Sequence, residues 1–255
     1  MTQRQVKAAV LLIGDELLSG RTQDVNLQTI AKFLGPLGVQ IAEVRVVPDI
    51  VEEIVAAVNA LRARYDYVFS TGGIGPTHDD KTADAMAAAF GVNIDVREDA
   101  RAILQAQYKD SSSLNEARLR MARIPDGALL IANPVSKAPG FQIGNVFVMA
   151  GVPSIMRGML TDIGHRIEGG AVVRSRTVRA KGIGESQIAA GLQQLETDAA
   201  GAVAFGSYPW FTPEGFGVHL VARSSDAAAL DKAGRDLMEL VRARGGDPEE
   251  VGDAA

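Results

Sequence analysis

The segment Tyr67–Asp84, YVFSTGGIGPTHDDKTAD, constrains the fold of this chain most strongly. Its first residues, Tyr67–Phe69, form an apolar run without polar alternation, which predicts a buried parallel strand. The three glycines that follow allow a sharp turn and a close approach to a ligand, because glycine has no Cβ. Thr77 and Asp80 match a capping pattern and predict a helix over 78–90. A glycine-rich turn between a strand and a helix N-terminus predicts a phosphate-binding site.

Three carboxylates, Asp79, Asp80 and Asp84, adjoin this turn. Asp80 and Asp84 are four residues apart, so a helix would place them on one face. Carboxylates beside a bound phosphate repel it unless a divalent cation lies between them, which favours a metal-dependent phosphate site. Simpler interpretations stay open: the glycines only join strand to helix, and Asp80 only caps the helix. The GGxG pattern matches neither the Walker loop nor the dinucleotide-binding glycine pattern.

Strands and helices alternate through the first half of the chain. The expected strands are Lys7–Ile13, Val39–Val47 and Tyr67–Phe69, and the expected helices cover 24–37, 48–63 and 78–90. This order predicts a three-layer α/β/α fold with a mostly parallel sheet, which binds ligands at the carboxyl ends of its strands. The loop Gly14–Gly20, Asp49 and the loop Gly72–Asp80 all follow strands, so we expect them to converge on one crevice.

The next segments continue the same fold. Helices with breaks near Ser111–Ser113 are expected over 95–123, strands over 128–131 and 146–150, and a helix from about Pro153 to Ile167. Between these strands lies the loop Asn133–Phe141, NPVSKAPGF, made rigid by two prolines. Lys137 is its basic residue and a candidate phosphate ligand. The alternative is an ordinary Pro/Gly turn with a solvated lysine.

A domain boundary is expected near Glu168-Gly169-Gly170, which divides the chain into a ligand-binding domain at 1–168 and a small α+β domain at 169–245. The second part is expected to follow the order β-α-β-β-α, with a turn-rich stretch at Tyr208–Gly215. Trp210 and Phe211 in that stretch are either an exposed contact patch or residues that pack the turn. The acidic residues 246–255 are expected to be disordered.

Composition excludes several classes of function. The net charge of −5 argues against a nucleic-acid partner, which requires a basic face. The chain has no cysteine, which excludes disulfides and thiol catalysis, and its three histidines lack metal-ligand spacing. The N-terminal apolar run is too short for a signal peptide and no segment is long enough to span a bilayer, so we expect a cytoplasmic protein without a membrane partner.

These motifs carry a family resemblance. The segment STGGIGPTHDDKTAD resembles the signature of the molybdenum-cofactor-biosynthesis (MoaB/Mog-like) domain, with Ile74 in place of the usual threonine, and VVPD, which ends at Asp49, resembles its second acidic segment. GDELLSG, Asn26, NPVSKAPGF, MAGVPSIM and KGIGES together resemble the competence/damage-inducible protein A group, from Ala8 to about Arg244. Many relatives have a glutamate where this chain has Ile155. Bacterial members often carry a C-terminal deamidase domain, to which no segment here corresponds.

The resemblance implies two enzymatic chemistries and one non-catalytic role. The first is divalent-metal-dependent cleavage of the pyrophosphate of ADP-ribose or a related nucleotide. The second is binding of molybdopterin or adenylyl transfer to it, and the third is a homo-oligomer that senses a nucleotide without catalysis. The implied cofactors are Mg or Co, with a monovalent ion or bound molybdopterin as further candidates. The implied partners are a nucleotide or pterin phosphate and further copies of the chain.

The resemblance also implies roles for individual residues. Asp80 and Asp49 would be catalytic and, with Asp84 or Asp15, would bind the metal or orient the nucleophile. The other interpretation of Asp49 is a plain helix cap. The residues implied to bind phosphate or substrate are Gly14, Asp15, Glu16, Ser19, Asn26, Thr71, Gly72, Gly73, Gly75, Pro76, Thr77, Lys137, Pro139 and Gly140.

Overall fold

The structure is a computed structural model that describes residues 4–107, 114–213 and 215–252. The chain forms two compact units, Met1–Ala171 and Val172–Ala255, and each is described by itself. The break near Ser111–Ser113 that the sequence predicts lies outside the described residues.

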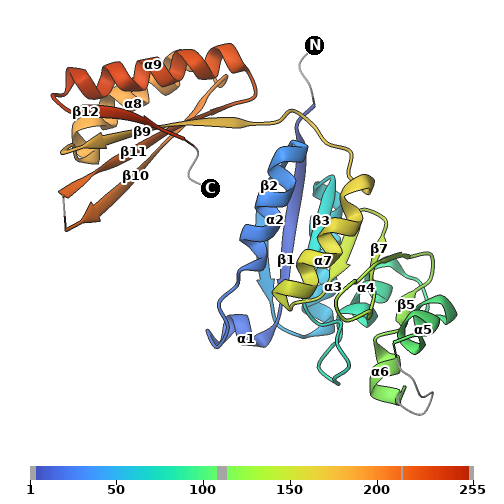
Figure 1. The fold of residues 1–255 in the computed structure, drawn as a ribbon. Helices are drawn as coiled ribbons and strands as arrows, with labels where there is room; N and C mark the ends of the chain where they lie inside the picture. The colour runs from blue at the N-terminus through green and yellow to red at the C-terminus, as the bar shows by residue number, and fades with distance from the viewer. Residues whose placement is uncertain (1–3, 108–113, 214, 253–255) are drawn as a thin grey trace. The chain divides into compact units, whose positions relative to one another are not determined.

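A six-stranded sheet forms the centre of the first unit (Figure 1). Its strand order is β2-β1-β3-β8-β7-β6. The first four strands run parallel, whereas β7 and β6 are antiparallel to their neighbours. The strands are β1 (Val6–Ile13), β2 (Val39–Val47), β3 (Tyr67–Thr71), β6 (Leu129–Ile131), β7 (Gly140–Ile143) and β8 (Val146–Met149).

Helices cover both faces of this sheet, because successive side chains of a strand point to opposite faces. In β1, Ala9, Leu11 and Ile13 pack into the core with helices α3 (Val51–Arg64) and α4 (Thr82–Phe90). Ala8, Val10 and Leu12 pack on the other face with α2 (Asn26–Leu34) and α7 (Pro153–Ile163). The predicted three-layer α/β/α architecture with a mostly parallel sheet is therefore confirmed.

The region between α4 and β6 is less helical than the sequence predicts. Helices α5 (Glu98–Gln105) and α6 (Glu116–Arg120) are present. The short strands β4 (Ile94–Val96) and β5 (Arg123–Pro125) flank them and pair antiparallel in a separate two-stranded sheet. Strands of three residues carry too little periodicity to be recognised in a sequence, and only their pairing defines them. The described residues also form the short helix α1 (Asp15–Leu18) and the 3₁₀ helices Gly35–Leu37 and Gly164–Arg166.

The second unit is a small α+β fold, as predicted. Its elements are β9 (Arg174–Lys181), α8 (Glu185–Ala199), β10 (Ala204–Thr212), β11 (Gly215–Ser224), α9 (Ala227–Ala243) and β12 (Asp247–Val251). The antiparallel sheet has the order β10-β11-β9-β12. The β-α-β-β-α-β succession with this order is the split βαβ arrangement. Both helices pack on one face, where Val178, Leu220 and Leu237 are fully buried.

Two predictions for this unit are wrong. Asp247–Val251, expected in a disordered tail, form β12 and pair with β9. The stretch Tyr208–Gly215, expected to be a turn, is mostly strand, because β10 and β11 stay paired as far as Thr212 and Gly215. Pro209 is tolerated there because β10 is an edge strand. The secondary structure of both segments is set by pairing with strands that are distant in the sequence, and not by the local turn residues.

Within the described ranges, no helix is long and apolar enough to cross a membrane.

Candidate functional site

The glycine loop after β3 has a backbone in the left-handed region that favours glycine. Gly72 has φ of 107°, and a Cβ there would lie 2.0 Å from the carbonyl oxygen of Ile13. Gly73 has φ of 65°, also in the left-handed region. The amide of Gly72 donates to the carbonyl oxygen of Met149 at 3.1 Å. The loop is therefore pressed against the carboxyl ends of β1 and β8, at the edge where parallel sheets bind ligands.

The backbone amides of Gly73, Ile74 and Gly75 donate to no acceptor within the described ranges. Consecutive free amides in a turned backbone form a concave anion-binding site, and buried amides are otherwise almost always paired. This loop therefore has the donors of a phosphate cradle.

The helix after the loop starts later than the sequence predicts. Helix α4 begins at Thr82 with Lys81 as its N-cap, so Thr77 does not cap it. The amide of Thr82 is occupied by the carbonyl oxygen of Gly73, and its hydroxyl donates to the carbonyl oxygen of Gly72. The N-terminus of α4 thus anchors the loop, and the free donors belong to the loop itself.

Asp80 holds the turn that follows the glycines. Its Oδ2 accepts hydrogen bonds from the amide of Thr77 at 2.8 Å and from the Thr77 hydroxyl. A Cβ on Gly75 would lie 3.0 Å from Asp80 Oδ1, so the carboxylate lies against the loop. The capping interpretation of Asp80 is therefore wrong for α4, and the residue caps the turn instead.

Asp49 lies against Gly73 of the loop but lines neither of the two cavities described below. Its Oδ2 accepts from the amide of Asp15 at 3.1 Å, and its Oδ1 would lie 3.3 Å from a Cβ on Gly73. Helix α3 begins two residues later, with Ile50 as its N-cap, so Asp49 is not the helix cap. Burial raises the pKa of Asp49, the Asp15 amide opposes this, and the nearby charges of Asp15, Glu16 and Asp79 raise it further.

A cavity of about 470 Å³ opens beside the loop. Its lining comes from four loops that follow strands, from Met121 after α6 and from α7, and apolar side chains such as Ile74, Ile155 and Met159 make up much of its wall. The predicted site residues that line it are Glu16, Gly72, Gly73, Gly75, Pro76 and Asp80. Lining residues that were not predicted as site residues include Thr22 and Met121, together with Asn133, Ser136, Ala138 and Gly151 from the NPVSKAPGF and MAGVPSIM motifs.

Other predicted site residues support the loops or lie outside this cavity. The side-chain amide of Asn26 joins the start of α2 to the loop after β8, because its Nδ2 donates to the carbonyl oxygen of Gly151 at 2.7 Å. The hydroxyl of Ser19 donates to the carbonyl oxygen of Glu16. Lys137 is exposed, with φ of 65°. Gly14 and Asp15 lie at the end of β1, Thr71 is buried in β3, and Gly140 begins β7.

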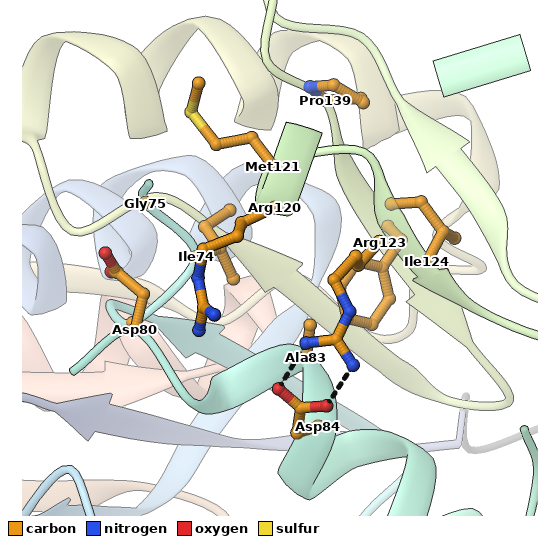
Figure 2. A pocket seen from close by; sticks show the side chains of 12 residues that line it. Ile74, Gly75, Asp80, Ala83, Asp84, Arg120, Met121, Arg123, Ile124 and Pro139 are labelled. Carbon is orange, nitrogen blue, oxygen red and sulfur yellow. Dashed lines mark hydrogen bonds and ion pairs between the residues drawn. The ribbon is translucent and has the colours of Figure 1, made fainter. Parts of the chain in front are cut away.

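A second, smaller cavity of about 20 Å³ adjoins the loop and includes Pro139 (Figure 2). Asp84, predicted to be a metal ligand, lines it and is held by Arg123. Two nitrogens of the guanidinium donate to the two Asp84 oxygens at 2.8 and 2.6 Å. This bidentate pair stabilises the carboxylate without a metal ion. The pair links α4 to β5, which no local sequence pattern could indicate.

The carboxylates that remain fit a metal only in part. In the described part of the chain, no group of three or more histidine or carboxylate side chains could hold a metal ion. Asp49 and Asp80 each keep Oδ1 without a hydrogen-bond donor among the described residues. Mg²⁺ commonly binds through one or two carboxylates together with substrate phosphates. These two residues therefore fit an ion that arrives with a phosphorylated ligand.

The fold and the site define a class of α/β/α protein with a glycine loop at the carboxyl edge of a mostly parallel sheet. The family model described as "Probable molybdopterin binding domain" matches residues 9–168, and the chain belongs to this family. The model of the FAD synthase middle domain matches residues 173–248.

The relatives narrow the resemblance to the CinA group, as the sequence predicts. A CinA-like protein of Citrifermentans bemidjiense is 36% identical over 267 residues, covering 97% of this chain and 62% of the relative. The chain thus spans less than two thirds of that relative. A protein of Caldivirga maquilingensis is 33% identical over 210 residues, covering 80% of this chain and 82% of its own length. The solved structure of CinA, of unknown function, from Thermoplasma acidophilum is 36% identical with a TM-score of 0.59, covering 63% of this chain and 96% of that one.

Proposed function

We propose that the chain is a divalent-metal-dependent pyrophosphatase that acts on ADP-ribose or a related nucleotide. The observation that carries the proposal is that Asp49 lies against Gly73 and Asp80 against Gly75, in one loop with three free amides. A pyrophosphate ester needs both kinds of group, because amides bind its oxygens and carboxylates hold a cation or orient water. The apolar cavity beside the loop suits the flat base of a nucleotide.

In this proposal the loop amides bind the phosphate and the carboxylates bind the metal ion. The amides of Gly73, Ile74 and Gly75 bind phosphate oxygens. Thr82 keeps the loop in a fixed geometry, because its amide and hydroxyl donate to the carbonyl oxygens of Gly73 and Gly72. Asp49 and Asp80 would hold Mg²⁺ or Co²⁺, which when bound neutralises phosphate charge and lowers the pKa of a coordinated water. The crowding of Asp49 by other carboxylates supports a cation in this position, since a cation relieves their repulsion.

An assay of the purified chain tests the proposal. ADP-ribose, FAD and related pyrophosphates are incubated with the chain in EDTA, in MgCl₂ and in CoCl₂, and AMP is measured by chromatography. We expect AMP to be released only when a metal is added. Absence of AMP with every substrate and metal would overturn the proposal.

A second candidate is binding of molybdopterin or adenylyl transfer to it, supported by the family match over residues 9–168. A pterin is also flat and phosphorylated, so the same cavity and loop suit it. Co-purification separates the two candidates: a pterin retained at near one equivalent, together with no AMP release, would favour the second. A homo-oligomer that only senses a nucleotide is the third candidate, and it predicts nucleotide binding without turnover of either kind.

A further inference from the structure

Arg120, at the end of α6, is a cation that the described structure leaves without a partner. Its Nε is buried and has no hydrogen-bond partner. No ion pair or hydrogen bond to its other nitrogens exists within the described residues. Figure 2 shows its side chain pointing into the small cavity beside the glycine loop, with the guanidinium between Asp80 and the Arg123–Asp84 pair.

The other charged groups of this cavity each have a hydrogen-bond partner, although Asp80 Oδ1 has none among the described residues. Arg123 and Asp84 bind each other through two hydrogen bonds, and Asp80 accepts from Thr77. Arg120 therefore differs from its neighbours. A buried donor without an acceptor costs free energy, and in a native protein it calls for an explanation such as a missing ion or ligand.

The small cavity shares its wall with the large one. Five residues line both, and they include the loop that carries the free amides: Gly73, Ile74, Gly75, Asp80 and Met121. The small cavity itself has room for little more than a water molecule. An anion bound at the amides of this loop would thus lie beside the cavity that the Arg120 guanidinium enters.

We propose that Arg120 binds a second phosphate of the ligand, and so makes this site selective for diphosphates over monophosphates. The inference rests on the proposed function only in placing phosphate at the glycine loop. The amides hold one phosphate, and a guanidinium binds the neighbouring phosphate through two parallel hydrogen bonds. Arg120 is a positioning and specificity residue, and the acids retain the catalytic role.

A purely structural role for Arg120 makes the opposite prediction about stability. A side chain that stabilises the fold has partners whose loss lowers the melting temperature. Arg120 has none among the described residues, so Arg120→Met, which keeps the aliphatic volume, should leave the melting temperature unchanged or raise it.

Calorimetric titration of the full chain tests the inference. AMP and, in place of ADP-ribose, its non-hydrolysable methylene analogue are titrated, with MgCl₂ present, into wild type, Arg120→Met, Arg120→Lys and the control Arg101→Met. Arg101 lies on α5, exposed and 3.4 Å from Glu98, so its loss removes the same charge away from the cavity. We expect Arg120→Met to weaken binding of the analogue by about 10- to 100-fold while AMP changes by less than about threefold. Arg120→Lys should restore binding partly, and the control should match wild type.

The outcomes separate this inference from the proposed function. Selective loss of affinity for the analogue without any AMP release from ADP-ribose upholds the role of Arg120 and overturns the pyrophosphatase. AMP release with unchanged affinity in Arg120→Met overturns the role of Arg120 alone. Equal weakening of both ligands, or a lowered melting temperature with affinity intact, also overturns it. No binding of either ligand to wild type overturns both.

Discussion

The hydroxyl of Thr82 donates to the carbonyl oxygen of Gly72 at 2.9 Å and joins the first turn of α4 to the end of β3. Thr82 is fully buried, and its amide also donates to the carbonyl oxygen of Gly73. One residue therefore holds both glycines in the conformation that exposes the next amides. The conformation of the loop therefore depends on the two hydrogen bonds from Thr82 as well as on the glycines.

Replacement of Thr82 by valine should lower the free energy of unfolding by about 1–3 kcal/mol, because the Gly72 carbonyl loses its side-chain donor while the shape is kept. Urea denaturation measures this loss. Thr82→Ser retains the hydroxyl and should lose clearly less. Equal stability of wild type and Thr82→Val would show that the bond contributes nothing.

Gly73→Ala should damage the loop more than the same change at another left-handed glycine. A Cβ on Gly73 would lie 2.2 Å from Thr82 Oγ1, so the anchor must move. Gly91, with φ of 66° at the end of α4, has nothing within 4 Å of such a Cβ. Gly91→Ala should cost about 1 kcal/mol for backbone strain alone, and Gly73→Ala should cost more and abolish ADP-ribose binding. Denaturation and calorimetry compare the two variants, and equal effects would contradict the anchor.

Asp80→Asn should keep the fold and lower metal-dependent turnover by about 100-fold or more, because the amide still accepts from Thr77 but loses the charge that holds a cation. Asp126→Asn is the control, since Asp126 is exposed after β5 and lines neither cavity. AMP release under MgCl₂ measures both. Unchanged turnover in Asp80→Asn would show that Asp80 only caps the turn and does not bind the metal.

Asp49→Asn should stabilise the protein at pH 7. The raised pKa of Asp49 means that the folded state favours the protonated form, so the wild type loses stability as pH rises above 3.8 and through the raised pKa. The advantage of the variant should grow over that window and then level off. Denaturation at pH values from 4 to 7 tests this, with Glu53→Gln, exposed on α3, as the control for general charge. A constant difference at all pH values would contradict it.

Much of the fold could be predicted because its signals are local. Continuous apolar runs predict the central parallel strands, such as β1 over Val6–Ile13. Pairing across long distances decided what local patterns could not. Because of this pairing, a polar stretch beside β9 becomes β12. The same kind of pairing extends β10 through Trp210 and Phe211, although the prolines and the glycine of the stretch Tyr208–Gly215 indicate a turn.

The candidate site was predictable only where it follows a strand. The glycine loop and Asp49 closely follow strands, and in a parallel sheet those positions meet at one edge, whereas Asp80 comes at the far end of the same loop. Arg120 and Met121 come from the segment between α5 and β5, which carries no such signal, yet both border the loop. The exposed side chain of Lys137, which the sequence favoured for its charge, does not line the cavity.

The sequence by itself determined the order of strands and helices and the place of the turn, because hydrophobic periodicity and glycine are properties of neighbouring residues. The tertiary structure alone decided which charges are paired. Asp84 is neutralised by Arg123, 39 residues away, whereas Arg120, three residues before Arg123, is left with an unpaired donor. The partner of a charged side chain depends on which distant segments the fold brings within hydrogen-bonding distance, and that distance is not encoded locally.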